Sequence, residues 1–182
     1  MNAEQATTPL FQRLLGPSFN VLPAPLRHLH DDRTHKIFAG RCRIERGRHW
    51  LVPLFAWVMS LPKGGEDLPV QIAIDSAQRR ETWARNFAGQ PMRSTLSEHD
   101  GYLVERMGPM GFRFALRVEG QAIVWTLAGV RLLGLLPLPL AWFSGVTARE
   151  SMQSDRYQFD VRAALPFVGP LIHYRGWLSV EP

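Results

Sequence analysis

Apolar residues recur at every second position in one segment after another of this chain, and this periodicity constrains its fold more than any other feature. Side chains i and i+2 of a β-strand point to the same face, so each row of this kind marks the buried face of a strand. Turn signals such as Asp100-Gly101 and Glu119-Gly120 separate the rows. The rows are Phe38, Cys42 and Ile44; Val70, Ile72 and Ile74; Trp83, Arg85 and Phe87; Leu103, Glu105 and Met107; Phe112, Phe114, Leu116 and Val118; Ile123, Trp125 and Leu127; Val146, Ala148, Glu150 and Met152; Tyr157, Phe159 and Val161; and the segment Leu171–Leu178.

Short alternating strands joined by tight turns are typical of an antiparallel sheet that buries one face. Helices do not alternate with the strands, which excludes a parallel β-α-β architecture. We therefore predict a mainly β (α+β) fold, a long antiparallel meander curved into a barrel or half-barrel. The 182 residues suit a single domain, 1–182, with an N-terminal helical segment at 1–34 and a sheet at 35–182 that carries insertions at 49–62 and 131–145.

Both insertions are apolar. Trp50–Pro62 has thirteen residues without a charge and is predicted to be helical, whereas Leu132–Ala148 has seventeen but is interrupted by glycines and prolines. A spanning helix needs about 20 apolar residues, so no transmembrane span is expected. Each segment is expected to cap the core, to close over a cavity, or to lie against a partner or the surface of a membrane.

The composition favours a cytoplasmic protein. The N-terminus lacks the basic and apolar regions of a secretory signal, and Cys42 is the only cysteine. The net charge is +5, and Lys36 and Lys63 are the only lysines among 21 basic residues. The arginine-rich run at 41–48 includes Glu45 and has no accompanying aromatic platform, so no nucleic-acid partner is expected.

Four charged side chains interrupt the apolar rows and are therefore predicted to face the interior. They are Arg46, Arg85, Glu105 and Glu150. A buried, unpaired charge costs several kcal/mol, so these groups should pair with one another or reach water. One interpretation is a structural ion network; the other is a polar patch in an apolar cavity that orients a ligand.

The second interpretation predicts non-catalytic binding of a hydrophobic or lipid-like ligand with an acidic or polar head. The two arginines would anchor the head, the two glutamates would hold the arginines, and aromatic rings would line the remaining surface. The predicted ligand-binding residues are Arg46, Arg85, Glu105, Glu150, Trp83, Phe87, Trp125 and Tyr174.

An enzyme could use the same cavity, with Glu105 or Glu150 as a general acid or base and His30 as a second group. A carboxylate free of arginine and open to the cavity would favour this alternative. The chain has no nucleotide-binding glycine loop, no nucleophile elbow and no zinc-binding helix motif, so no cofactor is expected. The spacing of His28, His30 and His35 matches no strong metal-ligand template, so no metal site is expected either.

Short motifs from about Leu10 to Leu178 support a family resemblance. They include Arg27-His28-Leu29-His30, Trp83-Ala84-Arg85-Asn86-Phe87, Glu105-Arg106-Met107-Gly108-Pro109, Pro137-Leu138-Pro139, Phe159-Asp160-Val161 and Tyr174-Arg175-Gly176-Trp177-Leu178. The chain resembles a bacterial family known as domain of unknown function 4166. Members also occur attached to short-chain or saccharopine-dehydrogenase-like oxidoreductases, so the resemblance implies an accessory or substrate-handling role. A third hypothesis is therefore an interaction module that docks on an oxidoreductase partner through Leu132–Phe143. The resemblance carries over no catalytic residue.

Overall fold

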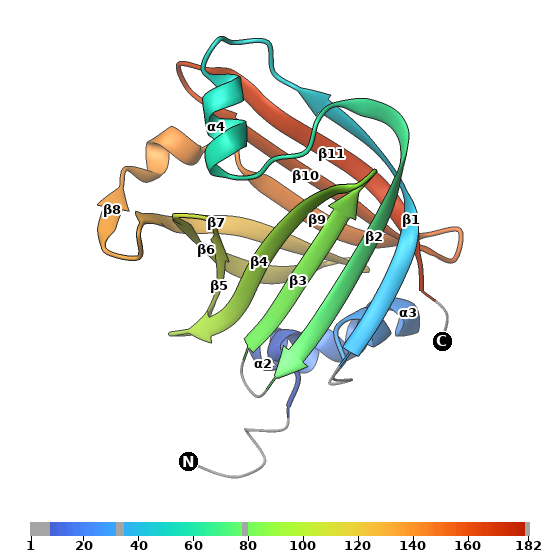
Figure 1. Cartoon of the computed structure of the whole chain (residues 1–182). Helices are drawn as coiled ribbons and strands as arrows, with labels where there is room; N and C mark the ends of the chain where they lie inside the picture. Colours follow the sequence, from blue (N-terminus) through green and yellow to red (C-terminus); the bar gives the residue numbers. More distant parts are fainter. Residues whose placement is uncertain (1–7, 32–34, 78–79, 181–182) are drawn as a thin grey trace.

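The structure, a computed structural model, describes residues 8–31, 35–77 and 80–180, and this part of the chain forms a closed antiparallel β-barrel (Figure 1). Ten strands form the wall in the order β1-β2-β3-β4-β5-β6-β7-β9-β10-β11, and β11 returns to pair with β1. The predicted mainly β meander is confirmed, and the sheet closes fully because β7 pairs with both β6 and β9. The strands are β1 (His35–Arg46), β2 (Gly65–Ala77), β3 (Arg80–Phe87), β4 (Gln90–His99), β5 (Tyr102–Met107), β6 (Met110–Glu119), β7 (Ala122–Leu132), β8 (Leu136–Leu138), β9 (Thr147–Gln153), β10 (Arg156–Leu165) and β11 (Gly169–Ser179).

Alternation along β1 shows how the sequence builds the wall. Phe38, Cys42 and Ile44 are buried, while the residues between them face solvent except for Gly40, which is half-buried. Gly40 lies where β1 and β11 cross so closely that a Cβ atom would come 1.8 Å from the carbonyl oxygen of Trp177. Only glycine allows this approach, which keeps the β1–β11 seam closed.

Strand β4 was not among the predicted rows, because Gln90-Pro91 read as part of a turn. Its inward residues are Met92, Ser94 and Leu96, so a serine interrupts the apolar row. Its remaining residues are mostly polar, and the alternation is correspondingly weak. Pairing with β3 and β5 on either side nevertheless makes it a full member of the barrel.

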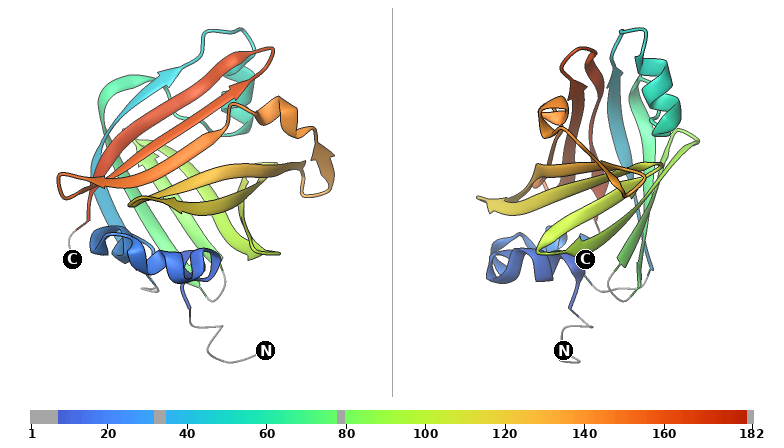
Figure 2. Two further views of the ribbon diagram at one scale, coloured as in Figure 1. Left: turned by 180° about the vertical axis from the view of Figure 1, so that it is seen from behind. Right: turned by 90° about the vertical axis from the view of Figure 1, so that its left-hand side faces the viewer.

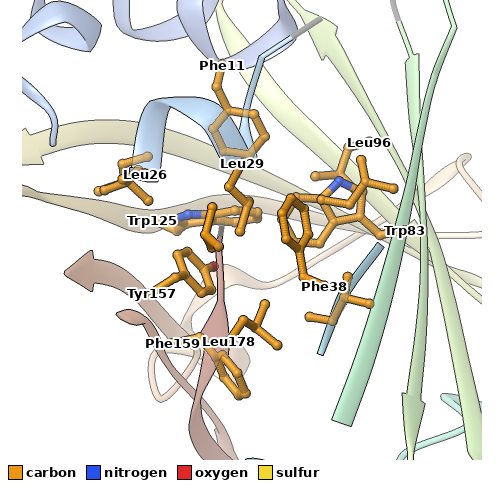
Figure 3. Packing of buried hydrophobic residues seen from close by; sticks show 14 of the residues in the cluster. Phe11, Leu26, Leu29, Phe38, Trp83, Leu96, Trp125, Tyr157, Phe159 and Leu178 are labelled. Carbon is orange, nitrogen blue, oxygen red and sulfur yellow. The ribbon is translucent and has the colours of Figure 1, made fainter. Parts of the chain in front are cut away.

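Short helices close one end of the barrel, below the strands in Figure 1. We call this end the plug. It consists of α2 (Leu10–Leu15), the 3₁₀ helix η1 (Gly16–Val21) and α3 (Ala24–Leu29), followed by His30 and Asp31. Phe11, Leu26 and Leu29 are buried against the barrel interior, where they meet Trp83 and Trp125 (Figure 3). Lys36, an inward residue of β1, donates to the carbonyl oxygens of Leu29 and Asp31 and to the Asp31 carboxylate, which fastens the plug to the wall.

The two insertions lie at the opposite end of the barrel (Figure 2). The predicted apolar helix is α4 (Val52–Val58), and Pro53 lies in its first turn. The second insertion forms β8, which pairs only with β7, and a 3₁₀ helix, η2 (Leu140–Phe143). In the described residues no helix is both long and apolar enough to cross a membrane.

Candidate functional site

A cavity of about 60 Å³ lies inside the barrel, and its lining is mostly apolar. Three charged side chains reach it, from β3, β5 and β9. Seven of the eight predicted ligand-binding residues line it; the exception is Arg46. The lining residues are Ile72, Trp83, Arg85, Phe87, Glu105, Phe114, Trp125, Val146, Thr147, Ala148, Glu150, Tyr157, Phe159, Val161 and Tyr174.

Arg85 forms the polar part of one wall. Strand alternation directs it inward, and only 7% of its surface is exposed. Its Nη1 donates to the Ser94 hydroxyl at 2.8 Å and its Nη2 donates to Glu105 Oε1 at 3.2 Å, so the predicted pairing of Arg85 with Glu105 is present. The guanidinium carbon lies 4.9 Å from the centre of the Trp83 ring. A guanidinium has five N–H donors and these contacts use two, which leaves capacity to bind an oxygen atom in the cavity.

Glu150 has a different partner from the one predicted. Its Oε2 lies 2.6 Å from Nε2 of His30, and His30 is fully buried. An ionised carboxylate only accepts hydrogen bonds, so His30 Nε2 is the donor in that state. The expectation that Glu150 would hold an arginine is therefore wrong: the plug supplies its partner. His30 follows α3, and its ring stacks on Phe11 with centroids 3.6 Å apart.

Arg46 lies away from this group. It is the last residue of β1, is half-buried, and does not line the cavity. A bulge between Cys42 and Ile44 shifts the register of β1 against β2, and Ile44 is the last β1 residue paired with β2. Ile44 is still buried, so the alternation itself persists beyond the bulge. Arg46 follows one step later at the end of the strand, where β11 pairs with it and β2 does not. Periodicity therefore did not place Arg46 on the cavity.

Two tyrosines complete the polar surface of the cavity. Burial raises the pKa of Tyr157 well above its ordinary value, and the charge of Glu150 and a hydrogen bond with it add to the increase. Burial likewise raises the pKa of Tyr174 to about 12. Both phenols are therefore neutral near pH 7. Tyr157 was not predicted as a site residue, although its row with Phe159 and Val161 indicated the direction of its side chain.

A further buried carboxylate, Glu81, lies next to the site and was missed. It precedes Trp83 by two residues, so extending that row by one step would have identified it. Trp83 Nε1 donates to Glu81 Oε2 at 2.8 Å. Burial raises the pKa of Glu81, while the nearby charge of Lys36 and the Trp83 hydrogen bond act in the opposite direction.

The histidines considered as metal ligands separate in space. His28 pairs with Asp31 at 3.2 Å, His30 with Glu150, and His35 with Asp75 at 2.5 Å on the surface. Across residues 8–31, 35–77 and 80–180, no group of three or more histidine, cysteine, aspartate or glutamate side chains is arranged to hold a metal ion.

Comparison with known proteins establishes the family. The model of the family described as domain of unknown function (DUF4166) matches residues 22–178. The chain belongs to this family. DUF4166 thus covers the barrel up to the penultimate residue of β11 and, in the plug, α3 with His30 and Asp31 but neither α2 nor η1. Every residue that lines the cavity lies within it.

Two further comparisons concern solved structures and curated proteins. The DUF4166 chain is similar to the crystal structure of Rv2717c from M. tuberculosis, with a TM-score of 0.47 and 13% sequence identity over 88% of this chain and 99% of that chain. No curated protein matches the sequence.

Proposed function

We propose that this domain binds a small, largely apolar molecule inside the barrel and holds its polar end at Arg85. One observation carries the proposal: a guanidinium with spare donors lies on the wall of a cavity that is otherwise lined mainly by rings and aliphatic groups. Binding sites for small molecules combine an apolar lining with a few placed polar groups in this way.

The size of the cavity limits what can enter. A volume of about 60 Å³ corresponds to about two water molecules at the density of the liquid, far less than the space for a drug-sized ligand. The polar end of a ligand would therefore occupy the cavity while its apolar chain extends outward. Thr147 lines the cavity and is exposed, and Val146 beside it is half-buried, so the chain would leave where β9 begins.

The charges in the cavity favour an uncharged polar head. Glu105 and Glu150 both reach the cavity, against one guanidinium. A free carboxylate would meet two like charges, whereas a hydroxyl or carbonyl oxygen can accept from Arg85 without that repulsion. Of the acidic and polar heads predicted from the sequence, we therefore infer the uncharged one.

Calorimetric titration with 1-octanol and octanoate tests the proposal. Octanol should bind and octanoate should bind more weakly. In Arg85→Met alone, Glu105 loses its partner and the fold is destabilised, so the informative variant is Arg85→Met combined with Glu105→Gln. Loss of a charged donor should lower octanol affinity by about tenfold or more.

Arg113→Met is the matched control, because Arg113 stacks on Tyr102 and does not line the cavity. Its octanol affinity should equal that of the unmodified protein. If neither probe binds, or if the double variant keeps full affinity for octanol, the proposed role of Arg85 is wrong.

A second candidate function is acid–base catalysis by Glu150. This carboxylate lines the cavity and pairs with His30 rather than with an arginine, which is the arrangement that favours an enzyme. We infer that Glu150 could remove a proton next to a ligand carbonyl while Arg85 donates to the resulting enolate oxygen. Octan-2-one in D₂O would then gain deuterium, and Glu150→Gln would abolish the exchange. Exchange at the uncatalysed rate in the unmodified protein would exclude this function.

A further inference from the structure

The exposed hydrophobic residues are concentrated at one end of the barrel. In an antiparallel meander every second connection emerges at the same end, and five connections lie opposite the plug: 47–64, 88–89, 108–109, 133–146 and 166–168. We call these connections the collar. Nine of the eleven large hydrophobic side chains that are exposed within the described residues belong to it. They are Trp50, Leu54, Trp57, Leu133, Leu135, Leu136, Leu140, Trp142 and Phe167.

The exposure is large for the bulkiest of these side chains. Trp50 is 78% exposed, Trp57 is 80% exposed and Phe167 is 90% exposed. Helix α4 buries Val52 and Ala56 against the barrel and directs Leu54 and Trp57 outward. A helix that only caps a core normally presents polar residues to water, whereas α4 contains none.

The collar is also free of acidic residues. None of its five connections contains an aspartate or glutamate, although Arg48 and Lys63 lie within it. Arg106 and Arg131 are exposed near the adjoining strand ends. Within the described part of the chain, none of these four cations forms an ion pair.

The acidic residues that flank the first connection pair with arginines outside the collar. Before this connection, Glu45 lies 3.0 Å from Arg43. Glu66 and Asp67, at the start of β2, pair with Arg43 and Arg41 respectively, at distances of 2.9 and 2.5 Å. The collar therefore combines projecting tryptophan and leucine side chains with unpaired positive charge.

From this combination we propose that the collar docks on the surface of an anionic lipid membrane. Tryptophan is favoured at the membrane interface because its ring is largely apolar and its N–H group needs a polar partner. Unpaired arginine and lysine side chains are attracted to anionic headgroups. The exposed hydrophobic residues belong to three separate connections, which contain α4, β8 with η2, and the β10–β11 turn. Distribution over several connections suits shallow insertion into a planar surface.

Docking in this orientation would bring the outer end of the cavity close to lipid. Val146 and Thr147 line the cavity and are separated from η2 by only Ser144 and Gly145, so a ligand could pass between the membrane and the barrel. Passage of a ligand from the membrane rests on the proposed ligand binding. Docking of the collar on a membrane does not depend on that binding.

Vesicle co-sedimentation tests the docking proposal. The full chain is mixed with vesicles of phosphatidylcholine alone or of phosphatidylcholine with phosphatidylglycerol. We expect binding to the mixed vesicles, weaker binding to the neutral ones, and a decrease as salt is raised. Trp50→Ala combined with Trp57→Ala should lower the partition coefficient by about tenfold or more.

Matched controls separate docking from general hydrophobicity and from loss of fold. Val21→Ala and Ile37→Ala remove the two large exposed hydrophobic side chains that residues 8–31, 35–77 and 80–180 have outside the collar, and should leave partitioning unchanged. Octanol affinity reports on the cavity independently and should survive the double tryptophan substitution. Three outcomes would overturn the proposal: no vesicle binding, equal losses in the control variants, or evidence that the collar mediates a dimer or an oxidoreductase complex that the double substitution dissociates.

Discussion

The plug and the collar are both built from short helices and apolar residues, yet they differ in what those residues contact. In the plug, Phe11, Leu26 and His30 are completely buried. In the collar, Trp57 and Leu135 are about four-fifths exposed. The difference arises because the plug folds back across the barrel opening, where it meets Trp83 and Trp125, whereas the collar extends away from it (Figures 1 and 3). Apolar composition alone therefore did not distinguish a core element from a surface one.

The largest expected contrast is in stability. Phe11→Ala removes a ring packed against His30, Trp83 and Trp125 and should lower the free energy of unfolding by about 3–5 kcal/mol. Trp57→Ala removes a larger ring, but from a solvated position, so the free energy of unfolding should change by no more than about 0.5 kcal/mol. Urea unfolding of both variants gives the comparison, and equal losses would mean that the two ends do not differ in packing.

Chemical labelling of Cys42 extends the comparison to the interior. Burial raises its pKa to about 11, compared with an ordinary value of 9.0, so at pH 8 the reactive thiolate is about 100-fold scarcer than in an ordinary cysteine. We expect iodoacetamide to label the folded chain at least that much more slowly than the urea-unfolded chain, as followed by mass spectrometry. Phe11→Ala should accelerate labelling and Trp57→Ala should not. Rapid labelling of the unmodified fold would show that the barrel interior is open.

A smaller effect concerns the dependence of stability on pH. The folded state raises the pKa of Glu81 above its ordinary value of 4.5. Between that value and the raised pKa, the folded state binds more protons at this carboxyl than the unfolded state does. The stability contributed by this group is therefore present at low pH and is lost as pH rises through the elevated pKa.

Glu81→Gln should remove that loss, so the variant gains stability relative to the unmodified protein as pH increases. At low pH the two should differ by no more than about 1 kcal/mol, the value of one hydrogen bond. Urea unfolding between pH 4 and pH 8 measures the difference, with the exposed Glu66→Gln as the control. A parallel pH dependence of the two proteins would contradict the assignment.

The smallest effect should come from the collar itself. Leu135→Ser replaces a leucine that is 81% exposed, so the free energy of unfolding should stay within about 0.5 kcal/mol of the original value. Its binding to phosphatidylglycerol vesicles should nevertheless weaken measurably. A large loss of stability would instead indicate that β8 is part of the structural core.

Local sequence patterns identified most of the barrel and much of the candidate site. Period two placed Arg85, Glu105 and Glu150 inside because alternation in a strand is a property of the backbone and needs no knowledge of neighbouring strands. The same rule failed where the backbone departs from regularity. In β7, Leu127 and Gly129 pair with two adjacent residues of β6, so Ala128 between them has no partner and forms a bulge. Beyond the bulge Val130 is buried, whereas regular alternation would bury Gly129.

The sequence by itself determined that this chain folds as an antiparallel sheet with charged groups on its inner face, since both follow from the two-residue repeat. The tertiary structure decided the partners of those charges, because His30 lies 120 residues from Glu150 along the chain and only closure of the plug brings them together. It also decided which apolar segments remain exposed. Burial depends on what packs against a surface, and that information is not contained in any short segment.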